Sequence, residues 1–210
     1  MEKPVPVELL KVRHLGMMPY QETLDRMLAF TADRQENTTD ELWLLEHPPV
    51  YTQGTSCDST TIGKTSIPLV KTDRGGQITY HGPGQLIAYI LSDLRRRHVG
   101  IRSLVGQLEA LVIDLLSRYD IVGDRRDGAP GVYVDGSKVA ALGLRVRRGC
   151  CYHGLSLNVD MDLSPFENIH PCGFEGLRVT RLADLGVGDS MSVVERNFVK
   201  LFVQSFRYTL

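Results

Sequence analysis

The sequence predicts an α/β fold of the α+β kind, with one mixed, mostly antiparallel sheet packed by helices. Two observations favour this class. Strand-like runs follow one another in groups, and helix-like patterns occur at the start, the middle and the end of the chain. A regular alternation of strands and helices, which would indicate a parallel sheet, is missing.

The elements follow from local periodicity. Residues 19–36 read as a helix that starts at Pro19, and residues 101–119 give the clearest helix. Its apolar stripe consists of Leu104, Leu108, Leu111 and Leu115. Single strands are predicted at residues 7–14, 41–46, 69–72, 85–91 and 151–159. Residues 52–66 are rich in Thr, Ser and Gly and predict a long loop.

Two further elements have sequence markers of their own. Residues 131–146 predict a hairpin, because Asp135-Gly136 is a type I′ turn signal between two β-rich runs. Ser192 and Glu195 have the spacing of a capping box, which predicts that a last helix opens there. No linker divides these elements, so residues 1–210 are expected to form one domain.

Composition narrows the class of function. The 210 residues carry a formal net charge of -1, which disfavours a nucleic-acid-binding protein. We expect no membrane association, because the apolar stretch at residues 86–91 is far too short to span a bilayer. The chain opens without a secretory signal, so its four cysteines are expected to be thiols in the cytoplasm. The arginine runs 95–97 and 145–148 predict solvated surface or a docking site for acidic proteins.

The first candidate site is a glycine-rich loop at residues 74–85. Its four glycines let the backbone approach a ligand closely, while Arg74, Tyr80 and His81 add polar groups. Such a loop can hold a carboxyl, phosphate or carbonyl group with backbone N–H donors, although a pair of tight turns is the simpler alternative. The spacing of a dinucleotide-binding fingerprint is missing.

The second candidate is Cys172, which Pro171 and Gly173 bracket in a segment without periodicity. A thiol in a shaped loop becomes a strong nucleophile when a neighbour stabilises its thiolate. The alternative is a buried cysteine that acts as a small hydrophobic residue.

The third candidate is Lys138, which lies just after the predicted hairpin turn among apolar residues. A lysine drawn into such surroundings can act as a base, whereas an exposed hairpin lysine is the commoner case. Spacing alone does not connect Lys138 to Cys172.

A zinc site is a weaker alternative. Cys150, Cys151, His153, His170 and Cys172 lie close in sequence, but they lack the usual spacing of zinc ligands. We therefore expect no metal.

Three separate blocks of the sequence share one pattern: residues 74–86, residues 138–146 followed by 153–159, and residues 166–173. Together they resemble the octanoyltransferases, also called lipoyl(octanoyl) transferases, and are specific for that family. The resemblance extends over residues 7–205, in the right order.

The resemblance implies a fold like that of the biotin and lipoate protein ligases. It also implies transfer of octanoyl or lipoyl groups from acyl carrier protein to a lysine of lipoyl domains, without a cofactor. The acceptors would be 2-oxoacid dehydrogenase E2 subunits and the glycine cleavage H protein. By the same resemblance, Cys172 would carry the acyl thioester and Lys138 would lower its pKa and shuttle protons. The residues that would line the acyl pocket are Arg74, Gly75, Gly76, Gln77, Ile78, Thr79, Tyr80, His81, Ala141, Leu142, Gly143, Gly154, Leu155 and Ser156.

One departure concerns Ser156, which stands where the family pattern has alanine and could make the pocket more polar. Three other functions remain open. An ATP-dependent lipoate or biotin ligase would need a nucleotide site, but Gly63-Lys64-Thr65 lacks the preceding glycine of a phosphate loop because position 58 is Asp58. A cysteine thioesterase would release free fatty acid, and a silent module would bind lipoyl domains without chemistry.

Overall fold

The computed structural model describes residues 7–57, 65–169 and 178–210. Its helices are α1 (Tyr20–Ala32), α2 (Ile101–Ser117) and α3 (Met191–Ser205), with short 3₁₀ helices η1 (Ser164–Asn168) and η3 (Leu182–Leu185). The strands are β1 (Glu8–Met17), β2 (Asp40–Glu46), β3 (Val50–Gln53), β4 (Leu69–Lys71), β5 (Ile78–His81), β6 (Gln85–Asp93), β7 (Gly131–Val134), β8 (Ser137–Arg147), β9 (Cys150–Asn158) and β10 (Tyr208–Thr209).

Seven strands form the main sheet, in the order β10-β1-β2-β6-β9-β8-β7. Strand β1 pairs in parallel with both β2 and β10, and the other four pairings are antiparallel. A smaller sheet has the order β4-β3-β5. The predicted mixed, mostly antiparallel sheet is confirmed.

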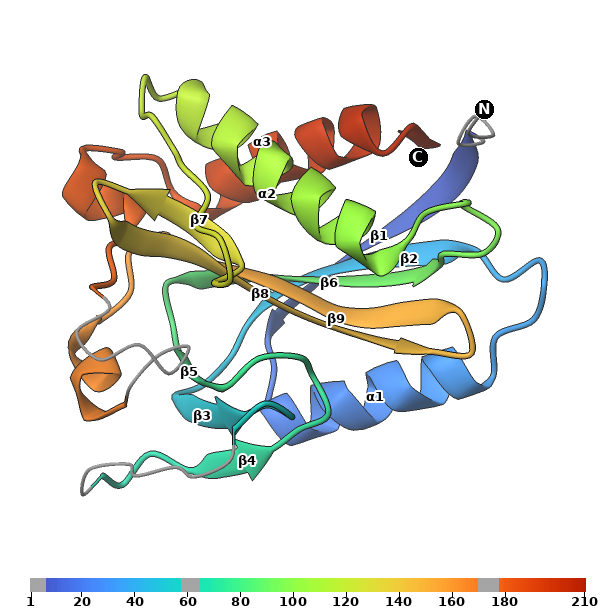
Figure 1. The fold of residues 1–210 in the computed structure, drawn as a ribbon, viewed down its shortest axis with the longest axis horizontal. Coiled ribbons are helices and arrows are strands. Elements are labelled where there is room, and N and C mark those ends of the chain that lie inside the picture. Colours follow the sequence, from blue (N-terminus) through green and yellow to red (C-terminus); the bar gives the residue numbers. More distant parts are fainter. Residues whose placement is uncertain (1–6, 58–64, 170–177) are drawn as a thin grey trace.

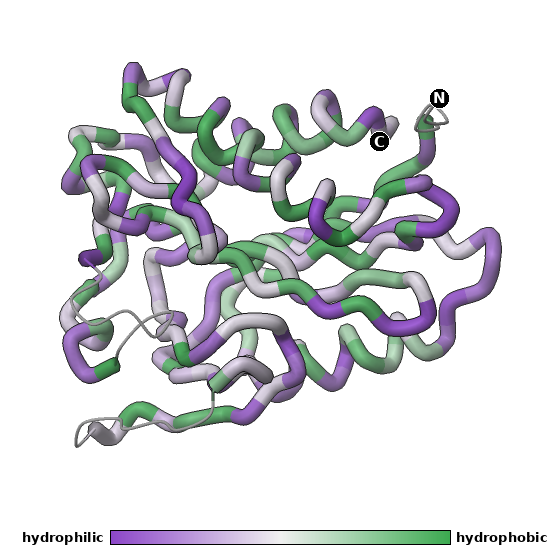
Figure 2. Tube along the Cα trace, in the orientation of Figure 1, coloured by the Kyte–Doolittle hydropathy of each residue, from purple (hydrophilic) through white to green (hydrophobic). Residues whose placement is uncertain are grey.

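Helices and the small sheet cover the two faces of the main sheet. Figure 1 shows α2 and α3 on one face, and α1 with β3, β4 and β5 on the other. One core of mainly aliphatic residues lies under α2 and α3, and a second core around Trp43, Tyr89 and Tyr152 lies under α1. Figure 2 shows hydrophobic residues gathered along the central strands and hydrophilic ones in the loops. Both faces of β6 and β9 are buried, as a sheet covered on both sides requires.

The predicted hairpin is confirmed as β7 and β8. Asp135 and Gly136 both have positive φ, at 47° and 75°, which a type I′ turn requires at its two central positions. The four leucines predicted to form the apolar stripe of α2 are all buried. These elements were predictable because their signals are local.

The predicted start of the last helix is wrong. The N-cap of α3 is Ser190, and the helix begins at Met191, so Ser192 already lies inside the first turn. The Ser190 and Ser192 hydroxyls bond to each other at 3.1 Å, and neither caps a backbone N–H group. The predicted loop at residues 52–66 also begins too early, because β3 continues to Gln53.

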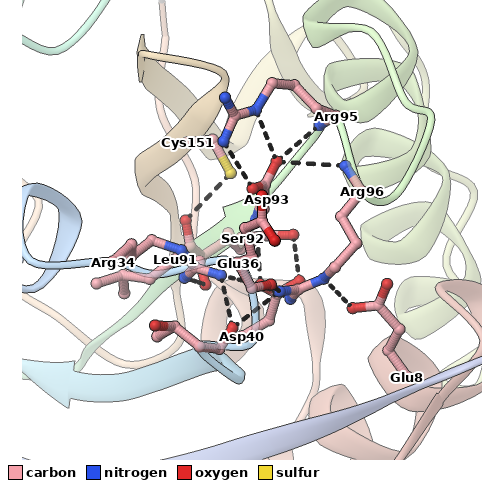
Figure 3. A network of polar contacts seen from close by, with 12 residues as sticks. Glu8, Arg34, Glu36, Asp40, Leu91, Ser92, Asp93, Arg95, Arg96 and Cys151 are labelled. Carbon is pink, nitrogen blue, oxygen red and sulfur yellow. Dashed lines mark hydrogen bonds and ion pairs between the residues drawn. The ribbon is translucent and has the colours of Figure 1, made fainter.

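The arginines at 95–97 are neither free surface nor a docking site as a group. Arg96 bonds to Asp40 at 2.7 Å and to Glu8 at 2.7 Å, which ties β2 to β1 (Figure 3). Arg97 is buried and its guanidinium carbon lies 4.0 Å from the centre of the Tyr208 ring. Arg95 is exposed and pairs with Asp93. By contrast, Arg145, Arg147 and Arg148 are exposed and form no salt bridge within the described part of the chain.

Candidate active site

A pocket of about 760 Å³, counted with its open mouth, lies between β8, β9 and the glycine-rich segment before β6. Sites for small molecules are usually concave and mostly apolar with a few placed polar groups. Both parts of this description fit, because the lining combines aliphatic side chains and backbone of β8 and β9 with the polar side chains of Arg74, His81 and Lys138.

Most of the residues predicted for the acyl pocket meet here. The lining includes Arg74, Gly76, Gln77, Ile78, Thr79, His81, Ala141, Leu142, Gly143, Gly154, Leu155 and Ser156, together with Lys138. Gly75 and Tyr80 do not line it. The Tyr80 ring packs against Tyr51 and Phe166, at centroid distances of 5.5 and 5.6 Å.

The glycine-rich segment is held against β8 by backbone contacts. The N–H of Gly75 donates to the carbonyl of Leu144 at 3.0 Å. A Cβ atom at Gly143 would lie 2.9 Å from the carbonyl oxygen of Gly75, so only glycine lets the two backbones approach this closely. Gly143 pairs directly with Gly154 on β9, where a Cβ atom would lie 1.9 Å from the carbonyl oxygen of Ala88. The glycines of the two strands therefore shape this part of the pocket.

Arg74 organises the loop from inside. It is buried, and its Nε and Nη2 atoms donate to Thr52, with the shortest bond of 2.6 Å to the Thr52 carbonyl oxygen. Its Nη1 atom donates to the carbonyl of Gly75 at 3.0 Å. The guanidinium thus joins the loop to β3.

Lys138 is buried at the pocket wall, with 4% of its surface exposed, so the exposed-hairpin alternative is wrong. Its Nζ atom donates to the carbonyl of Pro130 at 3.1 Å and lies 5.2 Å from the centre of the Tyr133 ring. A Cβ atom at Gly131 would lie 2.9 Å from Lys138 Cε and 3.2 Å from Nζ, so this glycine makes room for the lysine side chain.

The backbone of Lys138 is bound by the segment that follows residue 177. The N–H of Lys138 donates to the carbonyl of Arg178 at 2.8 Å, and the N–H of Thr180 donates to the carbonyl of Lys138 at 2.9 Å. Cys172 and His170 belong to residues 170–177, which lie outside the described residues. Whether Lys138 and Cys172 meet stays a prediction.

His81 is a neutral imidazole in the pocket wall. Gln85 Nε2 donates to Asn158 Oδ1 at 2.9 Å, so Gln85 Oε1 is left to accept the hydrogen of His81 Nδ1 at 2.7 Å. Burial is the main reason why the pKa of His81 falls to about 3. The uncharged ring keeps a lone pair on Nε2.

His47 and the tyrosines beside it form a second neutral group. His47 Nδ1 donates to the carbonyl of Met18 at 2.6 Å, and the Tyr89 hydroxyl donates to His47 Nε2 at 2.8 Å. Burial lowers the pKa of His47 to about 4 and raises that of Tyr89 well above its ordinary value. Tyr20 stacks on His81 at 6.0 Å and donates its hydroxyl hydrogen to Thr72.

Asp73 binds two consecutive side chains of β9. It accepts the Nε2 hydrogen of His153 at 2.9 Å and the hydroxyl hydrogen of Tyr152. The bond from His153 is the main reason why the pKa of Asp73 falls to about 2. Burial lowers the pKa of His153, although the carboxylate opposes this shift.

The sequence analysis missed several residues of the pocket. Those that line it without having been predicted for it are Tyr20, Gln85, Tyr89, Ala140, Asn158, Phe166 and Val179. Gln85 ends the glycine-rich motif, and Asn158 and Phe166 lie within the family-like blocks, so their positions in the motifs were available signals. Tyr20 and Tyr89 are set by how α1 and β6 pack.

The described residues hold no group of three or more His, Cys, Asp or Glu side chains placed to bind a metal ion. Cys150 and Cys151 are buried free thiols, and Cys151 donates to the carbonyl of Ile90. Within the same part of the chain, no helix is long and apolar enough to cross a membrane.

Solved structures share this fold. Lipoate-protein ligase A bound with ATP superposes with a TM-score of 0.79 at 16% identity, over 98% of this chain and 87% of that one. The biotin protein ligase of Aquifex aeolicus, in complex with biotin and ATP, gives 0.59 at 14% identity, over 95% and 70% of the two chains. The predicted resemblance to the biotin and lipoate ligase fold is confirmed, and at such identities it concerns the fold alone.

Residues 19–206 match the family described as the lipoyl protein ligase A/B catalytic domain, which defines the class of this protein. Within that class, curated relatives are much more similar in sequence. An octanoyltransferase of Azoarcus sp. (strain BH72) is 59% identical over 90% of this chain and 84% of its own. One of Nitrosococcus oceani is 51% identical over 100% of this chain and 95% of its own. The chain therefore belongs to the octanoyltransferase family, whose members are acyltransferases.

Proposed function

We propose that this enzyme transfers an octanoyl group from acyl carrier protein to a lysine of lipoyl domains through a thioester on Cys172. The observation that carries the proposal is the buried Lys138, which faces a largely apolar pocket built from the family-like blocks of the sequence. A buried amine beside an acyl pocket is suited to moving protons, and an exposed one is not.

The first step exchanges one thioester for another. The Cys172 thiolate attacks the carbonyl carbon of the carrier thioester, a new C–S bond forms, and the carrier thiolate leaves with a proton from the Lys138 ammonium. Because a thioester is broken and another is made, the step is nearly thermoneutral and needs no ATP. Backbone N–H groups of the glycine-rich segment are candidates for stabilising the oxyanion.

The second step makes an amide. The neutral Lys138 amine takes a proton from the attacking lysine of the acceptor, the C–N bond forms, and the Cys172 thiolate leaves. The pair returns to its starting charges, and formation of the amide makes the overall reaction favourable. The chemistry uses no cofactor and no metal.

The partners follow from the same reaction. We assign the donor as octanoyl-acyl carrier protein, and the acceptors as the lipoyl domains of 2-oxoacid dehydrogenase E2 subunits and the glycine cleavage H protein. We place the activity in the cytoplasm and assign it to residues 1–210 acting as one catalytic domain. A solved structure of the same fold contains a bipartite lipoate protein ligase and its E2 lipoyl domain from Thermoplasma acidophilum, at 17% identity to this chain and a TM-score of 0.78.

The test is intact mass spectrometry of the purified protein after incubation with octanoyl-acyl carrier protein, without ATP. Wild type should gain one octanoyl group, which a lipoyl domain then removes. The Cys172→Ser variant should gain no labile adduct, whereas the control Cys57→Ser should behave as wild type. Modification of the acceptor that requires ATP would indicate a ligase, and release of free octanoate would indicate a thioesterase. An adduct that persists in Cys172→Ser would place the nucleophile on another residue.

A further inference from the structure

His153 is turned out of the normal strand pattern. Neighbouring residues of a strand point to opposite faces, yet Tyr152 and His153 both reach the carboxylate of Asp73. The cause is the backbone of His153, which has a φ of 60° in the left-handed region. Such a conformation is uncommon for a residue other than glycine, and conformations of this kind gather at functional sites.

The bond to Asp73 decides which nitrogen of His153 carries the hydrogen. A carboxylate with a lowered pKa accepts, so Nε2 donates and Nδ1 keeps its lone pair. His153 is 1% exposed and lines the pocket, but its Nδ1 atom has no hydrogen-bond partner among the described residues. Buried polar atoms are nearly always paired, so an unpaired one in a pocket wall points to a ligand.

The polar side chains near His153 donate their hydrogen bonds to other partners. The Tyr89 ring packs edge-on against His153 at 6.1 Å, and its hydroxyl hydrogen goes to His47. The hydrogen on His81 Nδ1 goes to Gln85. Arg74, which also lines the pocket, donates to Thr52 and to the carbonyl of Gly75. His153 Nδ1 and His81 Nε2 therefore each keep a lone pair, and a ligand that complements the unpaired Nδ1 brings a donor.

This polar end lies away from Lys138. The Nζ atom of Lys138 lies beside Gly131, which pairs with Ala141, whereas His153 pairs with Leu144. Three residues along β8 separate the two levels, or about 10 Å. An acyl chain whose carbonyl lies near Lys138 would direct its distal carbons toward His153.

We propose that His153 Nδ1 accepts a hydrogen bond from the distal part of the acyl chain, so that the pocket binds medium-chain acyl groups carrying a hydroxyl donor there. The proposal rests on the proposed function for the identity of the pocket as an acyl site. It names a substrate class beyond the unsubstituted octanoyl chain.

The test compares the binding of hydroxy and oxo free acids, which differ only by the two hydrogens of the alcohol. Dissociation constants are measured by calorimetry for octanoic acid and for hydroxy and oxo octanoic acids substituted at carbon 6 or carbon 7. A ketone can only accept, so it faces the Nδ1 lone pair unfavourably. At one of the two carbons, wild type should bind the hydroxy acid roughly tenfold more tightly than the oxo acid.

Two variants separate the role of Nδ1 from the stability of the fold. Asp73→Asn keeps the His153 ring but no longer fixes the hydrogen on Nε2. The Nδ1–H tautomer can then donate to the ketone, so the preference for the hydroxy acid over the oxo acid should fall to about threefold or less. His153→Asn should also lose the preference for the hydroxy acid, and it should keep the fold because asparagine tolerates positive φ. The control His14→Asn replaces an exposed histidine on β1 and should keep it.

Equal binding of the hydroxy and oxo acids by wild type at both carbons would overturn the proposal, as would an unchanged preference in His153→Asn. Because binding needs no acyl transfer, these outcomes are separate from a failure of the Cys172 mechanism. Octanoic acid serves as the reference for the unsubstituted chain: if none of the acids binds, this proposal falls, whereas the proposed function is decided by the octanoyl adduct in the mass measurement.

Discussion

His47 and His81 are held neutral by burial, and this makes the stability of the protein depend on pH. Their pKa values in the folded protein are about 4 and about 3, below the value of about 6.5 expected after unfolding. The unfolded chain therefore binds more protons than the folded one between these values. Stability from this source is complete above pH 6.5 and is lost as the pH falls toward 4.

We expect the free energy of unfolding to fall by about 1.4 kcal/mol per pH unit for each of these histidines below pH 6.5. Denaturant titrations at several pH values between 7 and 4.5 measure this slope. The variant His47→Gln should show a slope smaller by one proton. A flat free energy between pH 6.5 and 5 would contradict the neutral assignment.

Lys138 provides the test of proton transfer. Met has a similar length and tolerates burial, so Lys138→Met should fold while losing the amine. We expect the rate of octanoyl transfer to fall by about 10² to 10⁴, the usual contribution of a general acid or base. Single-turnover transfer to a lipoyl domain measures it, with exposed Lys11→Met as the control. A rate within threefold of wild type would remove Lys138 from the mechanism.

At the scale of elements, we expect replacement of a glycine by alanine to have opposite effects on stability in β9 and in α2. A Cβ atom at Gly154 would lie 1.9 Å from a backbone oxygen, so Gly154→Ala should lower the free energy of unfolding by about 3 kcal/mol. A Cβ atom at Gly106 in α2 would meet nothing within 4 Å, so Gly106→Ala should raise it by about 1 kcal/mol. Thermal unfolding of the two variants gives both signs. A tolerated Gly154→Ala would mean that β6 and β9 can separate.

Elements with local signals were predictable from the sequence, and features set by distant partners were not. The turn at Asp135 and Gly136 and the buried stripe of α2 depend on neighbours within a few residues. The turned side chain of His153 depends on Asp73, which is 80 positions away. Pairing of this range leaves no periodic pattern, so the bonds of His153 could not be predicted from the sequence.

The candidate site shows the same division. The family-like blocks located twelve of the fourteen expected pocket residues at the pocket wall, counted by comparing the two sets. The packing of Tyr80 against Tyr51 could not be read from the motif, because a motif does not reveal which of two neighbouring side chains faces inward. Arg97 was taken for surface because its partner, Tyr208, comes from the far end of the described chain.

At the scale of the whole molecule, Asp40 joins distant parts of the fold. It is fully buried and accepts bonds from Arg34, Arg96, Ser92 and Tyr208. Removing it leaves the buried Arg34 without a carboxylate and Arg96 with Glu8 alone, so Asp40→Ala should lower the free energy of unfolding by about 3–5 kcal/mol. The control Asp25→Ala, on the exposed face of α1, should change it by less than about 0.5 kcal/mol. Equal effects would show that the network is not stabilising.

Charge on the outside of the molecule concerns encounter with partners. Arg145, Arg147 and Arg148 are exposed at the end of β8, where they can attract an acidic carrier protein. We expect the apparent KM for octanoyl-acyl carrier protein to rise severalfold between low and physiological salt. Replacing all three by glutamine should raise KM at low salt and flatten its salt dependence. A wild-type KM that does not change with salt concentration would exclude electrostatic steering by these arginines.

The parallel pairing of β1 with β10 also affects how the chain is made. Glu8 pairs with Tyr208, whose hydroxyl reaches Asp40 as well. At the usual speed of synthesis, of about 5–20 residues per second, roughly 10 to 40 seconds pass between translation of these two partners. During that interval the edge of β1 that pairs with β10 has no partner strand. Pairing of β10 therefore follows the synthesis of β1 by at least this interval, and an open strand edge of this kind favours binding by chaperones until the partner strand arrives.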